Sequence, residues 1–509
     1  MKEGHRIARK NIRSRSCSIT MHYSTLPLLL LLSSQVSAEN VLGVYILSRH
    51  GDRTAKSTPP ANLTDLGYQE VYTSGSYYRS RYISSDATRR IHGMNSDLVK
   101  QSQITASAPA DTVLQNSAMG FLQGLYPPVG NSLGSNTLRN GTVIQSPLNG
   151  YQLIPLETVT TGTNSENSAW LQGSTNCANA QLSSNNYFTS AQYLATLDRT
   201  QSFYHGVSPM INRTFTANQT SFKNAYTIFD LLNVASIHNS SDNFPSAGLL
   251  TTDTFFQLRT LADQHEFGLA YNVSEPIRAV TGSIIAAQVV DALNATIAGK
   301  AKNKLNIQFG AYAGMLSYFG LANLTQASSD FYGVPDYASS LVWELVTNTS
   351  VSSTSFPTTD EISVRFYFHN GTTSNTSEPT EFPVFGGSQS PLPWSDFVAG
   401  MDKFAIYSQK DWCQACGNST GECSAAVLGG DDSSSLGSSS SSGNSSSSGS
   451  GGISKAVAGV IGAMVTLGVI LGLELLIMLV GGLRVVSKKR LAGAGTAHHG
   501  ASTGMATKA

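Results

Sequence analysis

The stretch that decides the fold is Val41-Leu-Gly-Val-Tyr-Ile-Leu47, followed directly by Ser48-Arg-His-Gly-Asp-Arg53. The first seven residues are mostly apolar and include β-branched side chains, a pattern typical of a strand buried on both faces, as in a parallel sheet. The polar residues begin where this strand ends. In open α/β sheets, ligands bind beyond the carboxyl ends of the strands. The sequence therefore predicts an α/β fold with a ligand site in the loop that follows this strand.

The residue types in this loop suit the transfer of a phosphoryl group. The imidazole of His50 offers a ring nitrogen as a nucleophile at neutral or acidic pH. Arg49 and Arg53 carry guanidinium groups that match phosphoryl oxygens in pairs. Gly51 lets the backbone approach an oxyanion closely. A surface loop with two arginines and one histidine is the plainer alternative, but this combination directly after a buried strand favours His50 as nucleophile, with Arg49 and Arg53 binding phosphate.

The loop resembles the RHGxR signature of the histidine phosphatase superfamily, in its acid phosphatase and phytase branch, and looks most like the fungal members. This resemblance implies a mainly parallel central sheet flanked by helices, of the phosphoglycerate mutase type, with an inserted, mainly helical cap domain. It also implies a phosphohistidine intermediate on His50 and no metal, and we expect no cofactor. The resemblance extends through Leu63–Gly67, Gly75–Tyr82, Ser117–Pro127, Val334–Leu345, Trp412, Cys413 and Cys416.

The sequence departs from the family pattern at three positions. Thr112 stands where the family carries a third phosphate-binding arginine. Tyr312 and Ala313 follow the expected strand Leu305–Phe309, where active members carry a His-Asp pair. Loss of a general acid typically costs ~10²–10⁴-fold in rate. The chain is therefore expected to be a weak catalyst, least impaired on aryl phosphates, whose leaving groups need no proton donor.

Three residues could replace the missing groups. Lys56 could supply the lost cation, Asp52 could donate a proton, and Tyr312 could hydrogen-bond a phosphoryl oxygen. Each also has a structural alternative: a surface lysine, an aspartate that stabilises the loop, or a core tyrosine.

The ends of the chain predict membrane attachment. Residues 1–38 combine basic residues, a short leucine run and a small-residue cleavage site, as in a signal peptide. Residues 456–483 contain one charged residue, Glu474, and are long enough to span a bilayer. Because residues 484–509 begin with basic side chains, we expect them to form a cytoplasmic tail. Residues 429–452, of which 20 of 24 are Ser or Gly, are expected to form a flexible stalk below an ectodomain over residues 39–428.

Composition and charge agree with an exterior location. Lys and Arg (32) balance Asp and Glu (32) over the whole chain, but residues 39–428 hold 20 basic and 28 acidic residues, a balance of −8. Such a domain is not expected to bind nucleic acid. Thirteen Asn-x-Ser/Thr sequons, which predict a glycoprotein, all fall on the side expected to be extracellular or lumenal: Asn62, Asn140, Asn212, Asn218, Asn239, Asn272, Asn294, Asn323, Asn348, Asn370, Asn375, Asn418 and Asn444.

Four cysteines remain once the leader, with Cys17, is removed: Cys177, Cys413, Cys416 and Cys423. An even number in an oxidising compartment predicts two disulfides, with three possible connectivities. The spacing of Cys413 and Cys416 would also suit redox or zinc chemistry, but no second such pair or neighbouring histidine supports it.

Three functions are compatible with these features. The first is a membrane-anchored extracellular phosphatase that hydrolyses phosphomonoesters through His50. The second is a weak or inactive pseudophosphatase that binds phosphate or phosphorylated ligands at the plasma membrane or another secretory-pathway membrane. The third is a glycosylated scaffold, against which the retained Arg49, His50 and Arg53 weigh. The natural substrate and the oligomeric state do not follow from the sequence.

Overall fold

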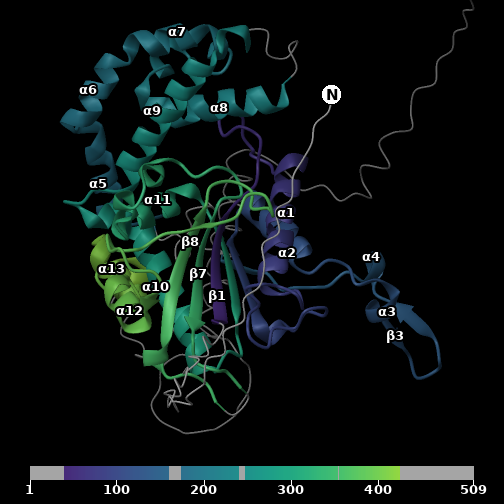
Figure 1. The fold of residues 1–509 in the computed structure, drawn as a ribbon. Coiled ribbons are helices and arrows are strands. Elements are labelled where there is room, and N and C mark those ends of the chain that lie inside the picture. Colours follow the sequence, from purple (N-terminus) through teal and green to yellow (C-terminus); the bar gives the residue numbers. More distant parts are fainter. Residues whose placement is uncertain (1–38, 160–173, 240–246, 353–354, 425–509) are drawn as a thin grey trace, which may run out of the picture. The chain divides into compact units, whose positions relative to one another are not determined.

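The computed structural model describes residues 39–159, 174–239, 247–352 and 355–424 (Figure 1). The predicted signal peptide, stalk, transmembrane helix and cytoplasmic tail lie outside these residues. Within them, the stretch Pro276–Ala298 is long and apolar enough to span a bilayer, but most of it is buried inside the protein, as in the core helix of a globular domain.

The fold is mixed α/β, built on a central sheet with the order β10-β8-β7-β1-β6-β2-β5 and with β9 paired to β8. β1 pairs in parallel with β6, which pairs in parallel with β2, and β2 with β5. The expected parallel arrangement thus holds for the half of the sheet formed by β1, β6, β2 and β5. β7, β8, β9 and β10 pair antiparallel. The strands are β1 Asn40–Arg49, β2 Ile104–Pro109, β5 Glu157–Val159, β6 Leu305–Gly310, β7 Ser340–Thr347, β8 Ile362–His369, β9 Thr380–Glu381 and β10 Leu392–Pro393.

β1 is the buried strand that the sequence predicts, because every residue after Asn40 is buried. Its side chains contribute to two separate hydrophobic cores. Val44 and Ile46 belong to the core that packs against α1 (Asp65–Tyr82) and α2 (Thr112–Leu125). Leu42 and Leu47 belong to the larger core, which includes α10 (Val280–Ala298) and α11 (Tyr312–Leu321). Helices therefore cover both faces of β1.

The described residues between β5 and β6 are mainly helical, as expected for the helical insertion. Figure 1 shows α6 to α9 gathered beyond one end of the central strands. A small hairpin and two short helices precede this segment in the sequence. The remaining elements are α3 Gly130–Gly134, β3 Ser135–Thr137, β4 Val143–Gln145, α4 Pro147–Gly150, α5 Ala178–Asn186, α6 Ala191–Arg199, α7 Gln201–Ile211, α8 Ala225–His238, α9 Thr252–Ala270, α12 Trp394–Met401 and α13 Gln409–Cys416.

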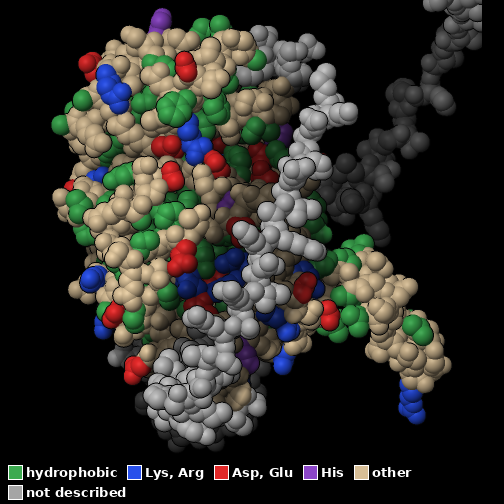
Figure 2. Space-filling model, in the orientation of Figure 1, with side chains coloured by type: hydrophobic (Ala, Val, Ile, Leu, Met, Phe, Trp, Pro, Cys, Tyr) green, Lys and Arg blue, Asp and Glu red, His purple; other side chains and the backbone are tan. Residues whose placement is uncertain are grey.

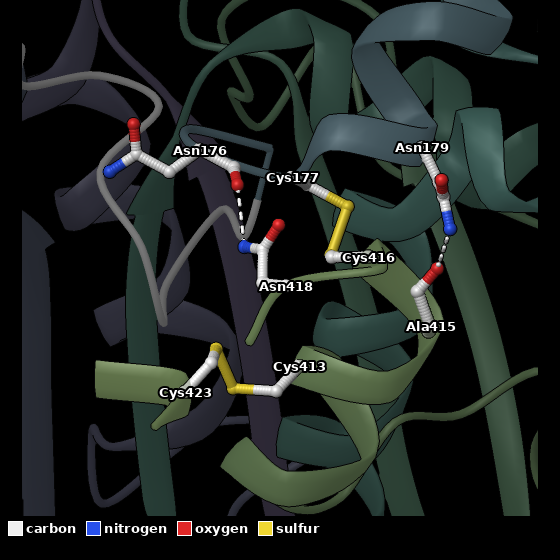
Figure 3. Close-up of a disulfide and its surroundings, with 8 residues drawn as sticks. All are labelled: Asn176, Cys177, Asn179, Cys413, Ala415, Cys416, Asn418 and Cys423. Atoms are coloured by element: carbon white, nitrogen blue, oxygen red, sulfur yellow. Dashed lines mark hydrogen bonds between the residues drawn. A yellow bond between two sulfur atoms is a disulfide. The ribbon is translucent and has the colours of Figure 1, made fainter. Parts of the chain in front are cut away.

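Two disulfides lie near the end of the described chain, and one of them joins this end to the helical segment (Figure 3). Cys177 pairs with Cys416 across 239 residues of sequence, and Cys413 pairs with Cys423. Two disulfides were predicted, and the structure selects one of the three connectivities. Since Cys413 and Cys416 are not bonded to each other, the pair is structural rather than a redox-active dithiol. Asn418 adds a hydrogen bond of 2.7 Å to the carbonyl of Asn176 beside this junction.

The surface agrees with the composition. Figure 2 shows one face on which Lys, Arg, Asp and Glu are scattered among uncharged side chains and backbone.

Candidate active site

The loop after β1 is held against the first turn of α1 by direct backbone packing. A Cβ atom built on Gly51 would lie 2.2 Å from the carbonyl oxygen of Gly67, and one built on Gly67 would lie 2.0 Å from that of Asp52. Any larger residue at either position would push the two segments apart. The side chain of Thr64 caps α1 by accepting a hydrogen bond from the amide of Gly67. This close contact fixes the path of the loop from His50 to Arg53.

His50 is buried, at 2% exposure, and its ring has a defined orientation. Nδ1 lies 2.8 Å from the carbonyl oxygen of Gly51. The backbone carbonyl of His50 accepts a hydrogen bond of 2.9 Å from the amide of Ala338. With Nδ1 engaged, Nε2 is the ring nitrogen left for nucleophilic attack. Burial, followed by the positive charges of Arg49 and Arg53, holds the pKa of His50 well below its usual value, so that the ring stays neutral in mildly acidic solution.

Arg49 is held by groups from three other elements. One terminal nitrogen, Nη1, donates to the carbonyl of Pro335, and Nη2 donates to the hydroxyl of Tyr226 at 3.3 Å. Its Cζ lies 5.0 Å from the ring centre of Tyr312 and 4.7 Å from that of Tyr337. Such cation–π contacts stabilise a desolvated guanidinium without neutralising its charge.

Arg53 forms a buried ion pair with Asp230 of α8. Nη2 donates to Oδ1 at 2.9 Å and Nη1 donates to Oδ2 at 3.2 Å, with both side chains 2% exposed. Nη2 also donates to the hydroxyl of Tyr226 at 3.4 Å, so that this one oxygen bridges Arg49 and Arg53. The Nε atoms of both arginines are buried and, within the described residues, have no hydrogen-bond partner. Buried donors of this kind are costly when unsatisfied.

His50 and Arg53 line a cavity of about 720 Å³. Asp111 and Val113 line it from the start of α2, and Ala313 lines it from α11. The other residues around it are Lys56, Pro59, Ala61, Ser174, Thr175, Ala180, Gln181, Ser184, Leu269, Ala270, Arg278, Thr281 and Ser317. A larger cavity, of about 1140 Å³, runs along α9 and is not lined by His50 or Arg53, so its size does not make it the site of this chemistry.

The sequence matches the model of the histidine phosphatase superfamily (branch 2) over residues 58–369, more than half of the chain. The chain belongs to this superfamily. The matched range begins just after the loop of His50, so the match does not include Arg49, His50 or Arg53. No curated protein sequence matches this chain.

Two solved phytase structures share the fold of this chain. The apo phytase of Hafnia alvei superimposes with a TM-score of 0.52 at 12% identity, covering 75% of this chain and 98% of its own. The phytase of Citrobacter braakii superimposes with a TM-score of 0.50 at 13% identity, covering 74% of this chain and 99% of its own. At such low identity the likeness extends to the fold alone.

The contacts of Asp52 do not favour the role of proton donor that the sequence allows for it. Its Oδ2 accepts hydrogen bonds from Nε2 of His238, at 2.6 Å, and from the hydroxyl of Thr64, at 2.5 Å. The Asp52 amide donates to a carboxylate oxygen of Glu70 at 2.7 Å. The side chain is fully buried in these contacts and ties the loop to α1 and α8.

Lys56 and Tyr312, the other two candidate replacements, lie near Arg49 and Arg53. The Nζ atom of Lys56 is 5.5 Å from the ring centre of Tyr312, and Lys56 lines the cavity of His50. The hydroxyl of Tyr312 donates to Glu266 at 2.7 Å, and the other carboxylate oxygen of Glu266 lies 2.8 Å from Nδ1 of His265. Tyr312 therefore supports Arg49 with its ring, while its hydroxyl is committed to a neighbouring carboxylate.

Of the positions that depart from the family pattern, Ala313 lines the cavity of His50 and Thr112 does not. Ala313 lines it, so a residue at that position faces the reacting groups. Thr112, assigned from the sequence to the third arginine position, is exposed at the start of α2, whereas its neighbour Val113 is buried and lines the cavity. A cation carried at position 113, rather than 112, would point toward the ligand.

Four functional neighbours of the loop had no signal in the sequence. Tyr226 and Asp230 lie one turn apart on α8, Tyr337 lies in the loop before β7, and Glu70 lies on α1. Burial raises the pKa of Glu70 to about 7, although the hydrogen bond from the Asp52 amide opposes this shift. The segment Val334–Ala338 had been noted for its family resemblance, but its contacts with Arg49 and His50 could not be foreseen from it.

Proposed function

We propose that this protein hydrolyses phosphomonoesters through a phosphohistidine formed on His50. The observation that carries the proposal is that the buried imidazole of His50 and the guanidinium of Arg53 line one cavity, next to Arg49 in the chain. Burial and the charges of both arginines hold the pKa of His50 well below its usual value. In the first step Nε2 of His50 attacks phosphorus and the ester P–O bond breaks. In the second step water attacks the phosphohistidine, which releases inorganic phosphate and restores the imidazole.

Arg49 and Arg53 would bind the phosphoryl oxygens and stabilise the charge that develops on them during both transfers. The leaving oxygen must gain a proton. Ala313 faces the cavity where the resemblance implies an acid, so no carboxylic acid at that position protonates the leaving oxygen. We therefore infer a preference for aryl phosphates, which leave as weakly basic phenolates, over alkyl phosphates.

Binding without efficient turnover is the second candidate function. It is favoured by Ala313 and by the engagement of the Tyr312 hydroxyl with Glu266, which together leave no carboxylic acid at the positions implied by the resemblance. Steady-state assays of the purified protein with an aryl phosphate at mildly acidic pH separate the two. Turnover that is lost in His50→Asn supports hydrolysis, whereas phosphate binding without His50-dependent turnover supports the binding role.

We also infer that the protein acts outside the cytoplasm, attached to a membrane. The inference rests on the signal-like leader, the apolar stretch with its basic flank, and the sequons. The two disulfides are compatible with it, since disulfides persist in oxidising compartments. Protease added to the outside of intact cells tests this topology. It should digest the ectodomain and leave the cytoplasmic tail protected.

A further inference from the structure

The larger cavity, of about 1140 Å³ along α9, has an aromatic wall. The ring centre of Phe267 lies 4.8 Å from that of Tyr332 and 5.9 Å from that of Tyr271, and all three rings line the cavity. Tyr332 is 50% exposed, and Val273, which also lines the cavity, is 77% exposed. Apolar surface of this kind in a hollow of this size is typical of a ligand site.

The polar groups of this cavity suit an uncharged ligand. Its charged side chains are two arginines and four carboxylates, a balance that disfavours an anion such as a phosphate ester: Arg259, Arg278, Asp263, Glu275, Asp330 and Asp336. Both arginines form ion pairs, Arg259 with Asp263 and Arg278 with Glu275. The remaining polar side chains are hydroxyls and amides: Ser190, Thr260, Ser329, Asn186, Gln192, Gln264, Asn272 and Asn370. Such groups beside an aromatic wall suit a sugar ring, which has hydroxyl groups and an apolar face.

Asn272 begins a glycosylation sequon, Asn272-Val-Ser274, and lines this cavity. Its Oδ1 accepts a hydrogen bond of 3.0 Å from the amide of Ser274, and within the described residues its Nδ2 donates to no acceptor. The sequon residues Asn62, Asn370 and Asn418 differ, because their Nδ2 atoms donate to oxygens of the protein. Asn272 therefore offers its amide nitrogen for modification at the wall of the cavity.

We propose that Asn272 carries an N-linked oligosaccharide whose first sugar rings lie in this cavity, against Phe267 and Tyr332. In the transfer, Nδ2 forms a bond to C1 of the first sugar, and the bond from C1 to the phosphate of a lipid-linked pyrophosphate oligosaccharide breaks. The lipid pyrophosphate leaves as an anion, and one proton passes from Nδ2 to solvent. Because the sugar is tethered to the cavity wall, its association with the rings is intramolecular and needs only weak contacts.

This inference rests on the proposed exterior location, since glycosylation at such sequons belongs to secreted and surface proteins. It does not depend on catalysis by His50. The glycan would cover the exposed aromatic wall and exclude free ligands from the cavity.

Asn140 is a matched control, because it has the same local geometry without a cavity. Its Oδ1 accepts a hydrogen bond of 3.0 Å from the amide of Thr142, and the residue is exposed. A Cβ atom built on the intervening Gly141 would meet no atom within 4 Å. This sequon lies between β3 and β4, and Figure 1 shows β3 standing apart from the central strands. A glycan on Asn140 is therefore expected to extend into solvent.

The test uses the full-length protein, expressed in a eukaryotic cell and digested in its folded state with peptide-N-glycanase. Mass spectrometry of peptides follows the conversion of each glycosylated asparagine to aspartate. We expect release from Asn272 to be slower than release from Asn140 by roughly tenfold or more, because the enzyme acts only on molecules in which the glycan has left the cavity. After denaturation the two sites should be released at similar rates.

Two tyrosine variants test the contact with the aromatic wall. Tyr332→Ala removes an exposed ring from the cavity and should bring the release from Asn272 close to that from Asn140. Tyr72→Ala removes a ring of similar type from α1, 39% exposed and outside this cavity, and should leave the difference unchanged.

Three results overturn the proposal: an unmodified Asn272 in protein that is glycosylated at Asn140, equal rates of release at the two sites, or slow release that persists in Tyr332→Ala. Each of these leaves the proposed exterior location in place. Protein without a glycan at either site overturns that location together with this inference. His50-dependent turnover is measured separately and stands or falls independently of these results.

Discussion

Asp230 accepts hydrogen bonds from both terminal nitrogens of Arg53, at 2.9 and 3.2 Å, and both side chains are 2% exposed. The partners are 177 residues apart in the sequence. The ion pair joins the loop of the proposed nucleophile to helix α8, so the charge of the site and the packing of the helical segment depend on each other.

Removing one partner of this ion pair should destabilise the protein more than removing both partners. Arg53→Met leaves the carboxylate of Asp230 buried without its counter-ion, and we expect the free energy of unfolding to fall by about 3–5 kcal/mol. The double variant Arg53→Met/Asp230→Leu removes both charges and should recover at least half of that loss. Urea unfolding of the two variants and wild type measures the difference. A double variant no more stable than Arg53→Met would show that the carboxylate is not the source of the loss.

Tyr226→Phe should weaken phosphate binding. Its hydroxyl accepts from Nη2 of both Arg49 and Arg53, so the variant leaves two buried donors without this acceptor and loosens both arginines. We expect a loss of roughly threefold to tenfold in phosphate affinity, the equivalent of about 1 kcal/mol.

Tyr204→Phe is the control for this experiment. Tyr204, on α7, has a buried hydroxyl with no hydrogen-bond partner among the described residues. Its removal should leave phosphate affinity unchanged. Equal effects of the two substitutions would argue against a role for the bridging hydroxyl.

Glu70 should make stability depend on pH in the range below neutrality. Burial raises the pKa of this carboxyl from an ordinary value of 4.5 to about 7, against the hydrogen bond from the Asp52 amide, which favours the charged form. A raised pKa favours the protonated folded state, so its contribution is complete below the unfolded pKa and is lost as the pH rises through about 7. Glu70→Gln should remove this loss, on the order of 2 kcal/mol, while keeping an acceptor for the Asp52 amide.

Thermal unfolding of wild type and Glu70→Gln across mildly acidic to neutral pH measures this contribution. The melting temperatures of the two proteins should be equal at acidic pH. Toward neutral pH the variant should have the higher melting temperature. Parallel pH profiles would mean that Glu70 does not titrate in this window.

Val113→Arg should raise the affinity for phosphate, because position 113 lines the cavity of His50 and a guanidinium there adds a cation beside the ligand. We expect a gain of roughly tenfold in affinity at some cost in stability, since Val113 is buried. Thr112→Arg is the matched control, with the same new residue on an exposed position one residue earlier. Titration with inorganic phosphate compares them, and a larger gain from Thr112→Arg would place the missing cation at position 112.

Local features of the site could be predicted from the sequence, and its distant partners could not. The buried strand and the polar loop are continuous in the chain, so hydrophobic pattern and residue type are enough to predict His50, Arg49 and Arg53 as candidate site residues. Tyr226 and Asp230 reach the loop from a helix distant in sequence, and no motif marks them. For the same reason the pairing of Cys177 with Cys416 could not be chosen from spacing.

The parallel pairing of β1 with β6 followed from the type of strand, whereas the antiparallel half of the sheet carries no equally clear signal. β7 and β8 are also largely buried and apolar. Their direction depends on the connections between strands rather than on residue pattern. The orientation of Asp52 was equally hidden, because it depends on His238 at the far end of α8.

The central claim is that His50 becomes phosphorylated. The most direct measurement is mass spectrometry of the protein, rapidly quenched with base during turnover of an aryl phosphate, compared with His50→Asn and with His205→Asn, which alters an exposed histidine on α7. The account predicts one phosphoryl group on the peptide that contains His50, retained in His205→Asn and absent in His50→Asn. Turnover that continues in His50→Asn, or a wild-type enzyme that turns over with no phosphate on His50, would contradict it.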